Sequence, residues 1–263
     1  MKIGVFDSGL GGLTVVQAMT KVIKGAEIFY VADTKNAPYG EKTADQILQY
    51  SLNITQYLIH TYQIEALILA CNTATSSAIK HLRQKYPSLI IIGTEPGIKP
   101  AIALTKTGNI GVLATPATLK GNKYQTLVNT LSSTKDVALF EQACPGLVEQ
   151  IEKGDADSIE TKLLLEKWLI PMREKNVDTI VLGCTHYPLV AHVIEDIMHS
   201  KVKLIQTGHA IARHLLLLTE SKGHRNVGDL SVTIYVTGEL QVYLIDNILD
   251  TYENLHKIVI PIA

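Results

Sequence analysis

Two of the three cysteines in this 263-residue chain end similar apolar segments. Ile64–Thr73 aligns with Val177–His186 at a constant offset, 184 − 71 = 113, which places Cys71 over Cys184. Helix signals follow each thiol, with Asn72 or Thr73 as the expected N-cap after Cys71. A thiol at a helix N-terminus faces oriented amides and the positive end of the helix dipole, which favour thiolate. A lone cysteine is more often core filling, but two at matched positions favour chemistry.

Two opposed thiols suit inversion of configuration at the Cα atom of an amino acid. One thiolate can remove the proton from one face while the other thiol delivers a proton to the opposite face. Such a site must also stabilise a carbanion-like transition state through hydroxyl and amide donors. Candidates for this role, and for binding carboxylates, stand at the ends of the apolar runs: Ser8, Asn72, Thr73, Thr115 and Thr185.

One ionisable side chain accompanies each thiol in this pattern. Asp7 and His186 could tune the neighbouring cysteine or accept the substrate ammonium. The alternatives are a turn-forming aspartate before Gly9 and a hydrogen-bonded core histidine.

Short apolar runs rich in β-branched residues alternate with helical segments, which predicts an α/β fold with mostly parallel sheets. A second repeat, Lys2–Phe6 over Asn109–Leu113, indicates two pseudosymmetric lobes that face each other across a cleft. Similarity between unrelated buried strands is the alternative explanation of this short match. The expected strands are Ile3–Phe6, Glu27–Ala32, Leu67–Ala70, Leu89–Ile92, Ile110–Leu113, Thr179–Leu182 and Val202–Ile205.

Glycine and proline residues interrupt the secondary-structure pattern between Thr94 and Pro100, where we expect the chain to pass from one lobe to the other. We expect residues 1–95 and 207–263 to form the N-terminal lobe and residues 96–206 to form the second lobe. In open α/β sheets ligands bind beyond the carboxyl ends of the strands, so the cleft between the lobes is the expected site.

Bulk composition excludes several classes of protein. The formal net charge is −1, so the chain has no excess of positive charge to bind nucleic acid or an anionic membrane. No apolar run is long enough to span a bilayer, and Asp7 with nearby glycines is unlike a secretory leader. An odd cysteine count without a CxxC pair favours neither disulfides nor structural zinc. A cytoplasmic protein without a metal is therefore expected.

Four ordered sequence blocks resemble the hallmark blocks of bacterial glutamate racemases, which belong to the aspartate/glutamate racemase superfamily. The resemblance extends at least from Ile3 to Leu189, and four blocks in order are far more specific than any one of them. These blocks are Phe6–Thr14, Ala37–Gly40, Ala70–Ala74 and Leu182–Pro188.

The resemblance implies cofactor-independent interconversion of L- and D-glutamate, which supplies D-glutamate for peptidoglycan, in a homodimeric enzyme. It implies Cys71 and Cys184 as the acid/base pair and Glu152 as an auxiliary carboxylate, which the residues alone would not single out. Asp7 and His186 complete the expected catalytic set. The resemblance also implies the following substrate-binding residues: Asp7, Ser8, Pro38, Tyr39, Gly40, Asn72, Thr73, Thr115, Thr118, Thr185 and His186.

The chain departs from the family pattern at several positions near these blocks. Ala32 stands where glycine is common, Asn36-Ala37 where arginine often precedes the Pro-Tyr-Gly block, and Ala114 where glycine precedes threonine. Gln206–His209 replaces an Asp-Ser-Gly-like segment. The two thiols are unaffected, so these departures bear on substrate preference and regulation.

Four other interpretations of the sequence compete with glutamate racemisation. A dinucleotide-binding fingerprint starting at Gly9 lacks its last glycine, because Thr14 stands there. A zinc hydrolase using Cys71, Cys184 and His186 lacks the usual short ligand spacing. An inactive two-lobed binding protein would not need two matched thiols. Within the same superfamily, a racemase of aspartate or another acidic amino acid is the main alternative.

Overall fold

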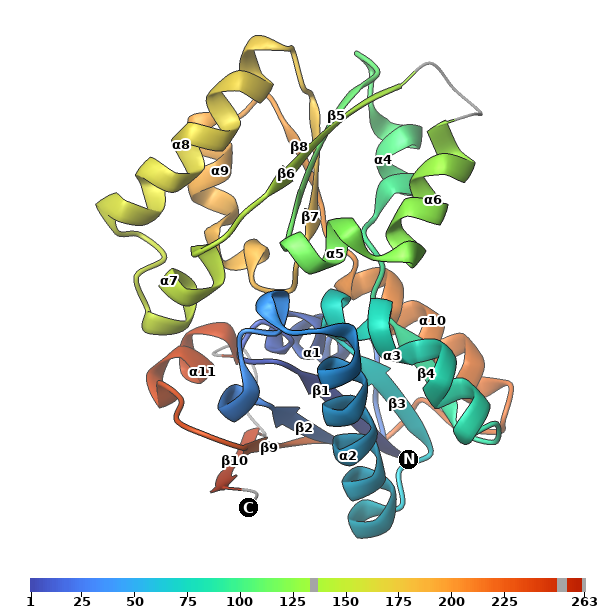
Figure 1. Cartoon of the computed structure of the whole chain (residues 1–263). Coiled ribbons are helices and arrows are strands. Elements are labelled where there is room, and N and C mark those ends of the chain that lie inside the picture. Colours follow the sequence, from blue (N-terminus) through green and yellow to red (C-terminus); the bar gives the residue numbers. More distant parts are fainter. Residues whose placement is uncertain (133–136, 250–254, 262–263) are drawn as a thin grey trace.

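The computed structural model describes residues 1–132, 137–249 and 255–261, which fold into two lobes (Figure 1). Each lobe has one sheet in which every paired strand runs parallel to its neighbour. Helices cover both faces of each sheet, as parallel strands require. The predicted α/β class with two lobes is confirmed.

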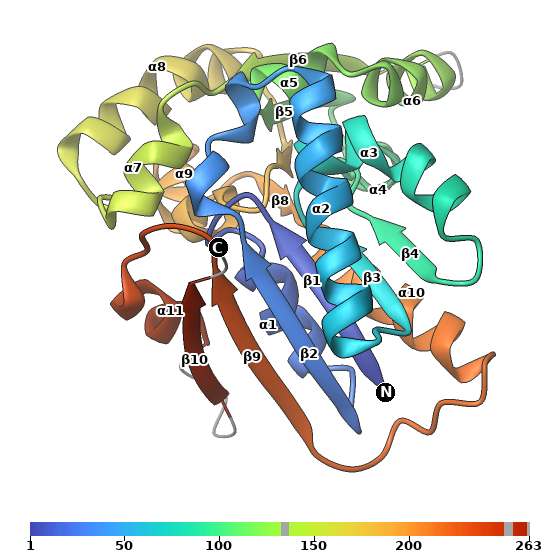
Figure 2. The same cartoon turned by 60° about the horizontal axis from the view of Figure 1, so that its bottom comes forward.

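The first lobe contains a six-stranded sheet in the order β10-β9-β2-β1-β3-β4, visible side by side in Figure 2. Helices α1, α10 and α11 cover one face, and α2 and α3 cover the other. Its strands are β1 (Lys2–Asp7), β2 (Ala26–Ala32), β3 (Ala66–Leu69), β4 (Ile90–Gly93), β9 (Leu230–Val236) and β10 (Leu255–Pro261). Its helices are α1 (Leu13–Thr20), α2 (Ala44–Tyr62), α3 (Asn72–Lys85), α10 (Gly208–Glu220) and α11 (Val242–Leu249), with short 3₁₀ turns η1 (Thr34–Asn36) and η2 (Tyr39–Glu41).

The second lobe contains a four-stranded sheet in the order β6-β5-β7-β8. Helices α4 and α6 pack on one face, and α7, α8 and α9 pack on the other. Its strands are β5 (Asn109–Ala114), β6 (Ala138–Ala143), β7 (Thr179–Gly183) and β8 (Lys203–Ile205). Its helices are α4 (Ile98–Leu104), α5 (Pro116–Lys120), α6 (Asn122–Ser132), α7 (Leu147–Lys153), α8 (Ile159–Glu174) and α9 (Ala191–Ile197), with a 3₁₀ turn η3 (Tyr187–Val190).

The sequence repeats occupy equivalent places in the two sheets. The order β2-β1-β3-β4 in the first lobe is matched by β6-β5-β7-β8 in the second. The repeated segments form β1 and β5 at one position and β3 and β7 at the next. Because strands in equivalent positions end at equivalent edges, the residues that follow β3 and β7 occupy matching sites in the two lobes.

Three strands escaped the sequence analysis. β6 is an edge strand whose described side chains are partly or largely exposed, so it lacks a continuous apolar run. β9 alternates buried and partly exposed residues at its start and joins β2 only after a long separation in sequence. β10 pairs with β9 at the edge of the first sheet. These strands extend or border the sheets, and tertiary pairing rather than local pattern defines them.

The chain crosses between the lobes twice. It leaves the first sheet after β4 and enters the second lobe at α4, and it returns between β8 and α10. Both crossings are short, and the ends of both sheets that carry the candidate residues meet between the lobes (Figure 1). Within the described parts of the chain, no helix is long and apolar enough to cross a membrane.

Candidate active site

Cys71 lies just beyond β3 of the first lobe and is itself the N-cap of α3. Its Sγ accepts a hydrogen bond from the Ala74 amide at 3.4 Å, so the N-cap is the thiol rather than Asn72 or Thr73. The Ser8 hydroxyl lies 3.8 Å from the same sulfur. Burial, and next the negative charge of Asp7, raise the pKa of Cys71 to about 12, although the Ala74 amide acts in the opposite direction. These surroundings favour the protonated thiol, contrary to what its helix position alone suggested.

Cys184 lies beyond β7 of the second lobe, at the position equivalent to that of Cys71. Its Sγ lies 3.6 Å from Nδ1 of His186. Both thiols are buried and both line one cavity of about 50 Å³ between the lobes. That volume holds only a few water molecules, since about 10–15 Å³ of such space accommodates one.

His186 and Glu152 form a buried pair beside Cys184. His186 Nε2 lies 2.5 Å from Glu152 Oε1, and the side chains are 2% and 22% exposed. Burial alone lowers the pKa of His186, but hydrogen bonds and charges from Cys184 and Glu152 outweigh it and raise the pKa well above 6.5. Burial alone raises the pKa of Glu152, but His186 and the Leu10 amide lower it overall. The pair is therefore an imidazolium and a carboxylate.

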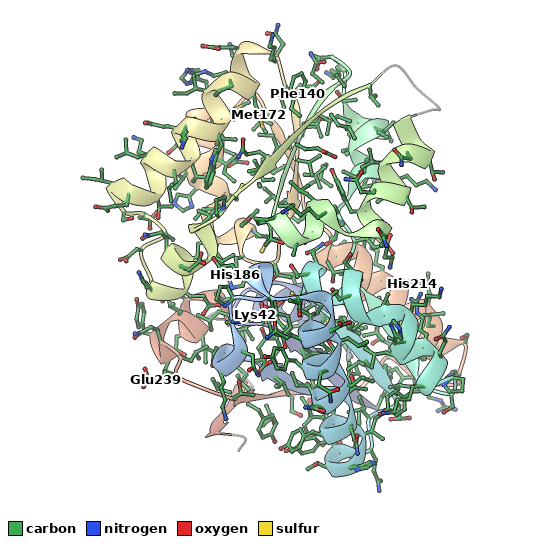
Figure 3. All side chains as sticks on the ribbon, viewed as in Figure 1. Lys42, Phe140, Met172, His186, His214 and Glu239 are labelled. Carbon is green, nitrogen blue, oxygen red and sulfur yellow. The ribbon has the colours of Figure 1, made fainter. Side chains whose placement is uncertain are left out.

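The glycine-rich loop of the first lobe packs directly against this pair. The Leu10 amide donates to Glu152 Oε1 at 2.6 Å, and the Gly11 nitrogen lies 3.2 Å from His186 Nε2. A Cβ atom at Gly11 would lie 2.6 Å from the Thr185 hydroxyl, so only glycine fits without displacing these groups. The loop therefore brings together groups from both lobes, as Figure 3 shows for His186 at their junction.

Asp7 is fully buried at the end of β1 and faces the same junction. It accepts hydrogen bonds from the Gly9 amide at 3.0 Å and from the Thr185 hydroxyl at 3.0 Å. Burial raises the pKa of Asp7, while the nearby charge of His186 lowers it less strongly. Thr185 is the bridge here, because it follows Cys184 in the second lobe and binds a carboxylate of the first.

Three threonine hydroxyls form a second bridge between the lobes. Thr73 Oγ1, in the first turn of α3, lies 3.0 Å from Thr115 Oγ1 and 3.3 Å from Thr118 Oγ1. Thr115 caps α5 and Thr118 lies within that helix, with 2.9 Å between their hydroxyls. All three are buried. The cluster is a set of preorganised donors beside Cys71.

The Pro38–Gly40 segment closes another side of the cavity. Asp33, at the end of β2, accepts hydrogen bonds from the Tyr39 hydroxyl at 2.5 Å and from the Thr237 hydroxyl at 2.7 Å. Burial, and next the charge of Asp33, raise the pKa of Tyr39 far above 10, so the hydroxyl stays protonated as a donor. These bonds hold the segment so that Gly40 packs against Thr115 of the other lobe.

Most of the expected site residues line the cavity, and three do not. Asp7, Glu152 and Thr118 lie behind the lining and act on it through hydrogen bonds. The residues that line it are Ser8, Pro38, Tyr39, Gly40, Cys71, Asn72, Thr73, Thr115, Cys184, Thr185 and His186.

Sequence reasoning missed one wall of this cavity. Cys144, Pro145 and Gly146, between β6 and α7, line it together with Val148 and Glu149. Burial raises the pKa of Cys144 to about 12, so this thiol is neutral. The only available signal was the Cys144-Pro145 pair itself, because β6, which precedes it, is too polar to be recognised as a strand.

Two of the four departures from the family pattern, at Asn36 and at Gln206–His209, lie at different places around the cavity. Asn36 donates to both oxygens of Asp33 at 3.1 Å and so supports the Pro38–Gly40 segment. Gln206–His209 lines a separate hollow behind the catalytic cavity, which Asn72, Cys184 and Thr185 also border. Across the described ranges, no three or more His, Cys, Asp or Glu side chains are grouped to hold a metal ion.

Comparison with known proteins gives a consistent family assignment. The Asp/Glu/Hydantoin racemase family matches residues 3–215. A glutamate racemase of Sulfurovum sp. (strain NBC37-1) is 65% identical over 253 residues, covering 96% of this chain and 96% of the relative.

Solved structures of glutamate racemases share the whole architecture. The Escherichia coli enzyme in complex with L-glutamate and the activator UDP-MurNAc-Ala is 28% identical, with a TM-score of 0.83 and 98% of each chain covered. The Francisella tularensis enzyme in complex with D-glutamate is 27% identical, with a TM-score of 0.82 and 98% of this chain and 97% of the other covered.

Proposed function

The chain belongs to the Asp/Glu/Hydantoin racemase family, and we propose that it interconverts L- and D-glutamate without a cofactor. One observation carries this proposal. Two thiols from equivalent strand ends of opposite lobes, Cys71 and Cys184, line a single buried cavity. The racemases of Escherichia coli and Francisella tularensis, whose solved complexes hold L- and D-glutamate, support the choice of substrate.

In the proposed mechanism each thiol serves one face of the substrate Cα. The thiolate of one cysteine takes the Cα proton, and the thiol of the other gives its proton to the opposite face. The two cysteines exchange protonation states in one turnover, so the reverse reaction starts from the product state. Burial and Asp7 favour the protonated thiol of Cys71, and a bound substrate ammonium beside it would lower its pKa by supplying an opposite charge.

The side chains around the thiols have separate parts in this proposal. His186, held as an imidazolium by Glu152, stabilises the Cys184 thiolate at 3.6 Å. Asp7 lies behind the lining, and its part is to position the Thr185 hydroxyl and to place a negative charge near Cys71. Hydroxyls and amides of the remaining set hold the two carboxylates and the charge that develops on the α-carboxylate. These are Ser8, Tyr39, Gly40, Asn72, Thr73, Thr115 and Thr185. Pro38 has no N–H and shapes the cavity wall by packing, and Thr118 acts through its hydrogen bonds to Thr73 and Thr115.

We predict that glutamate is preferred over aspartate. A substrate one methylene shorter cannot bridge the two carboxylate sites without leaving a buried donor unmatched, at about 1–3 kcal/mol. That cost corresponds to roughly ten- to over a hundredfold in kcat/KM. The decay of circular dichroism from each L-amino acid measures the preference, and deuterium exchange at Cα in heavy water detects slower turnover.

Two outcomes would redirect the proposal. Faster turnover of L-aspartate than of L-glutamate would assign the chain to aspartate racemisation. No exchange with any acidic amino acid, in folded protein with reduced thiols, would leave a two-lobed binding protein. Activity should also survive dialysis against a chelator and should not need pyridoxal phosphate.

The wider role follows from the same assignment. We propose that the enzyme acts in the cytoplasm as a homodimer and supplies D-glutamate for peptidoglycan, and therefore for cell-wall synthesis and cell shape. We also propose residues 1–95 with 207–263, and residues 96–206, as its two structural units. Sedimentation at micromolar concentration tests the dimer, and depletion of the protein with D-glutamate rescue of growth tests the role.

A further inference from the structure

A large groove outside the catalytic cavity has a marked excess of positive charge. It measures about 1370 Å³ and lies between α2 and α3 of the first lobe and α5 and α6 of the second. The chain as a whole has a net charge of −1, yet five lysine and arginine side chains line this groove against one acidic side chain. These residues are Lys42, Lys80, Arg83, Lys120 and Lys123, with Glu41 as the acid and His81 as a further ionisable neighbour.

Two of the five cations are already engaged. Lys123 is paired with Glu95 at 2.5 Å, and the Arg83 guanidinium donates to the Ile91 carbonyl at 2.9 Å. Over the stretches of chain that the structure describes, no ion pair joins Lys42, Lys80 or Lys120 to an acid. Lys80 and Lys120 are exposed and Lys42 is partly buried. Three cations, two of them on the first lobe and one on the second, therefore act on whatever occupies the groove.

The groove adjoins the catalytic cavity. Gly40, Glu41 and Pro116 line both, so the groove and the cavity with the two thiols share a wall at these residues. Figure 3 labels Lys42 on the first lobe. The groove is far larger than the catalytic cavity, which makes it a vestibule rather than a tight binding pocket.

We propose that this basic groove is the route by which the anionic substrate reaches the two thiols, and that Lys42, Lys80 and Lys120 concentrate acidic amino acids there. This inference rests on the proposed function for the identity of its substrate. A cleft lined by one sign of charge focuses the field and raises the local concentration of the opposite ion. The lysines would favour acidic over neutral and basic amino acids in the groove. The cavity would then select among the acidic amino acids by the length of the side chain.

The test removes the three charges and compares two matched variants. The triple variant Lys42→Gln, Lys80→Gln, Lys120→Gln should lower kcat/KM for glutamate roughly three- to tenfold at about 0.01 M salt, where the Debye length is about 30 Å. Its kcat should stay unchanged, and the difference should shrink at 0.15 M salt and above. The Lys→Arg triple variant keeps the charge and should retain the wild-type value. Three Gln substitutions at the exposed Lys162, Lys167 and Lys175 make the same change in net charge far from the groove.

A second readout does not depend on racemisation. Iodoacetate and iodoacetamide both alkylate a thiolate by displacing iodide and forming an S–C bond, but only iodoacetate is an anion. The ratio of their rates at Cys71 and Cys184, followed by mass spectrometry, cancels changes in thiol reactivity. That ratio should fall about three- to tenfold in the groove Gln variant and stay constant in the Arg variant and in the variant on α8.

The outcomes separate this inference from the proposed function. A lower iodoacetate ratio without racemisation of any amino acid would uphold the groove and refute the glutamate assignment. Normal racemisation with an unchanged ratio and an unchanged salt dependence would refute the groove. An equal loss in the α8 variant would also refute it, because net charge alone would then explain the effect.

Discussion

At the scale of single residues, the site consists of two thiols in unequal surroundings. Cys71 lies near the carboxylate of Asp7, whereas Cys184 lies near the imidazolium of His186. Burial and the Asp7 carboxylate favour the neutral thiol at Cys71, whereas the neighbour of Cys184 is a cation. The two thiols therefore differ in the sign of the charge beside them.

Replacing either thiol should abolish or severely reduce racemisation. Cys71→Ser and Cys184→Ser each remove the group that serves one face of Cα, and a positioned proton-transfer group contributes about 10²–10⁴-fold. Each variant should still eliminate a leaving group from one enantiomer of a β-substituted analogue, with the preferred enantiomer switching between them. The rates of elimination from the two enantiomers, determined for each variant, measure this preference. Racemisation near the wild-type rate in one variant would remove that cysteine from the mechanism.

Glu152 is expected to act through His186, because it does not line the cavity. Glu152→Gln removes a negative charge that raises the pKa of His186, so the imidazolium should lose its proton at lower pH. The alkaline limb of the kcat profile should therefore move to lower pH, with little change in KM. An unchanged dependence of kcat on pH would show that Glu152 serves only as a structural contact to the Leu10 amide.

The His186–Glu152 pair makes the stability of the folded protein depend on pH in two opposite directions. His186 has a raised pKa, so its contribution is complete below the ordinary value of 6.5 and is lost as pH rises through the raised pKa. Glu152 has a lowered pKa, so its contribution is present above its ordinary value of 4.5 and is lost as pH falls through the lowered pKa. The pair thus stabilises the closed lobes around neutral pH.

At the scale of elements, strand ends and loops position these groups. β3 and β7 deliver the thiols, and the loop between β1 and α1 delivers the backbone that meets His186 and Glu152. The loop can approach so closely because it has glycine where other residues would place a Cβ atom. The packing of this loop is therefore part of the catalytic geometry.

Gly11→Ala should impair catalysis more than stability. The added Cβ would lie 2.6 Å from Thr185 Oγ1 and 2.7 Å from His186 Cε1, so these groups must move. A shift of this kind near reacting groups costs roughly a hundredfold in rate. Gly208→Ala is the control, because its nearest neighbour would be the Ala18 Cβ at 3.2 Å. Equal kcat values for the two variants would argue against a positioning role for the loop.

At the scale of the whole molecule, the lobes meet through residues of the proposed active site. Contacts such as Leu10 to Glu152 and Thr73 to Thr115 close the cavity. The cavity is lined by residues of both lobes, so a substrate bound there contacts both lobes at once.

Glutamate should therefore stabilise the folded enzyme. Using Cys71→Ser prevents racemisation and keeps one enantiomer in solution. A ligand at about a hundred times its Kd adds about 2.7 kcal/mol, which raises the Tm by roughly 5–10 °C for a domain of this size. Differential scanning fluorimetry measures this shift, with lysine as the control amino acid. Equal stabilisation by glutamate and lysine would contradict a site built for two carboxylates.

The sequence by itself determined the features that repeat locally. Apolar runs with β-branched residues predicted the α/β class, and the repeat predicted Cys71 and Cys184 at equivalent strand ends. The start of α2 is likewise fixed by residues close together in the sequence, since Thr43 forms a capping box with Gln46. Such signals depend on residues a few positions apart, so the chain displays them without a fold.

Only the tertiary structure decided which distant groups meet. Glu152 reaches Leu10 across 142 positions, and Cys144 joins the cavity wall from an edge strand too polar to recognise. The protonation of Cys71 was also decided there, because burial and Asp7 outweigh the amide of its own helix. Long-range packing and desolvation depend on the whole fold, and no local pattern encodes them.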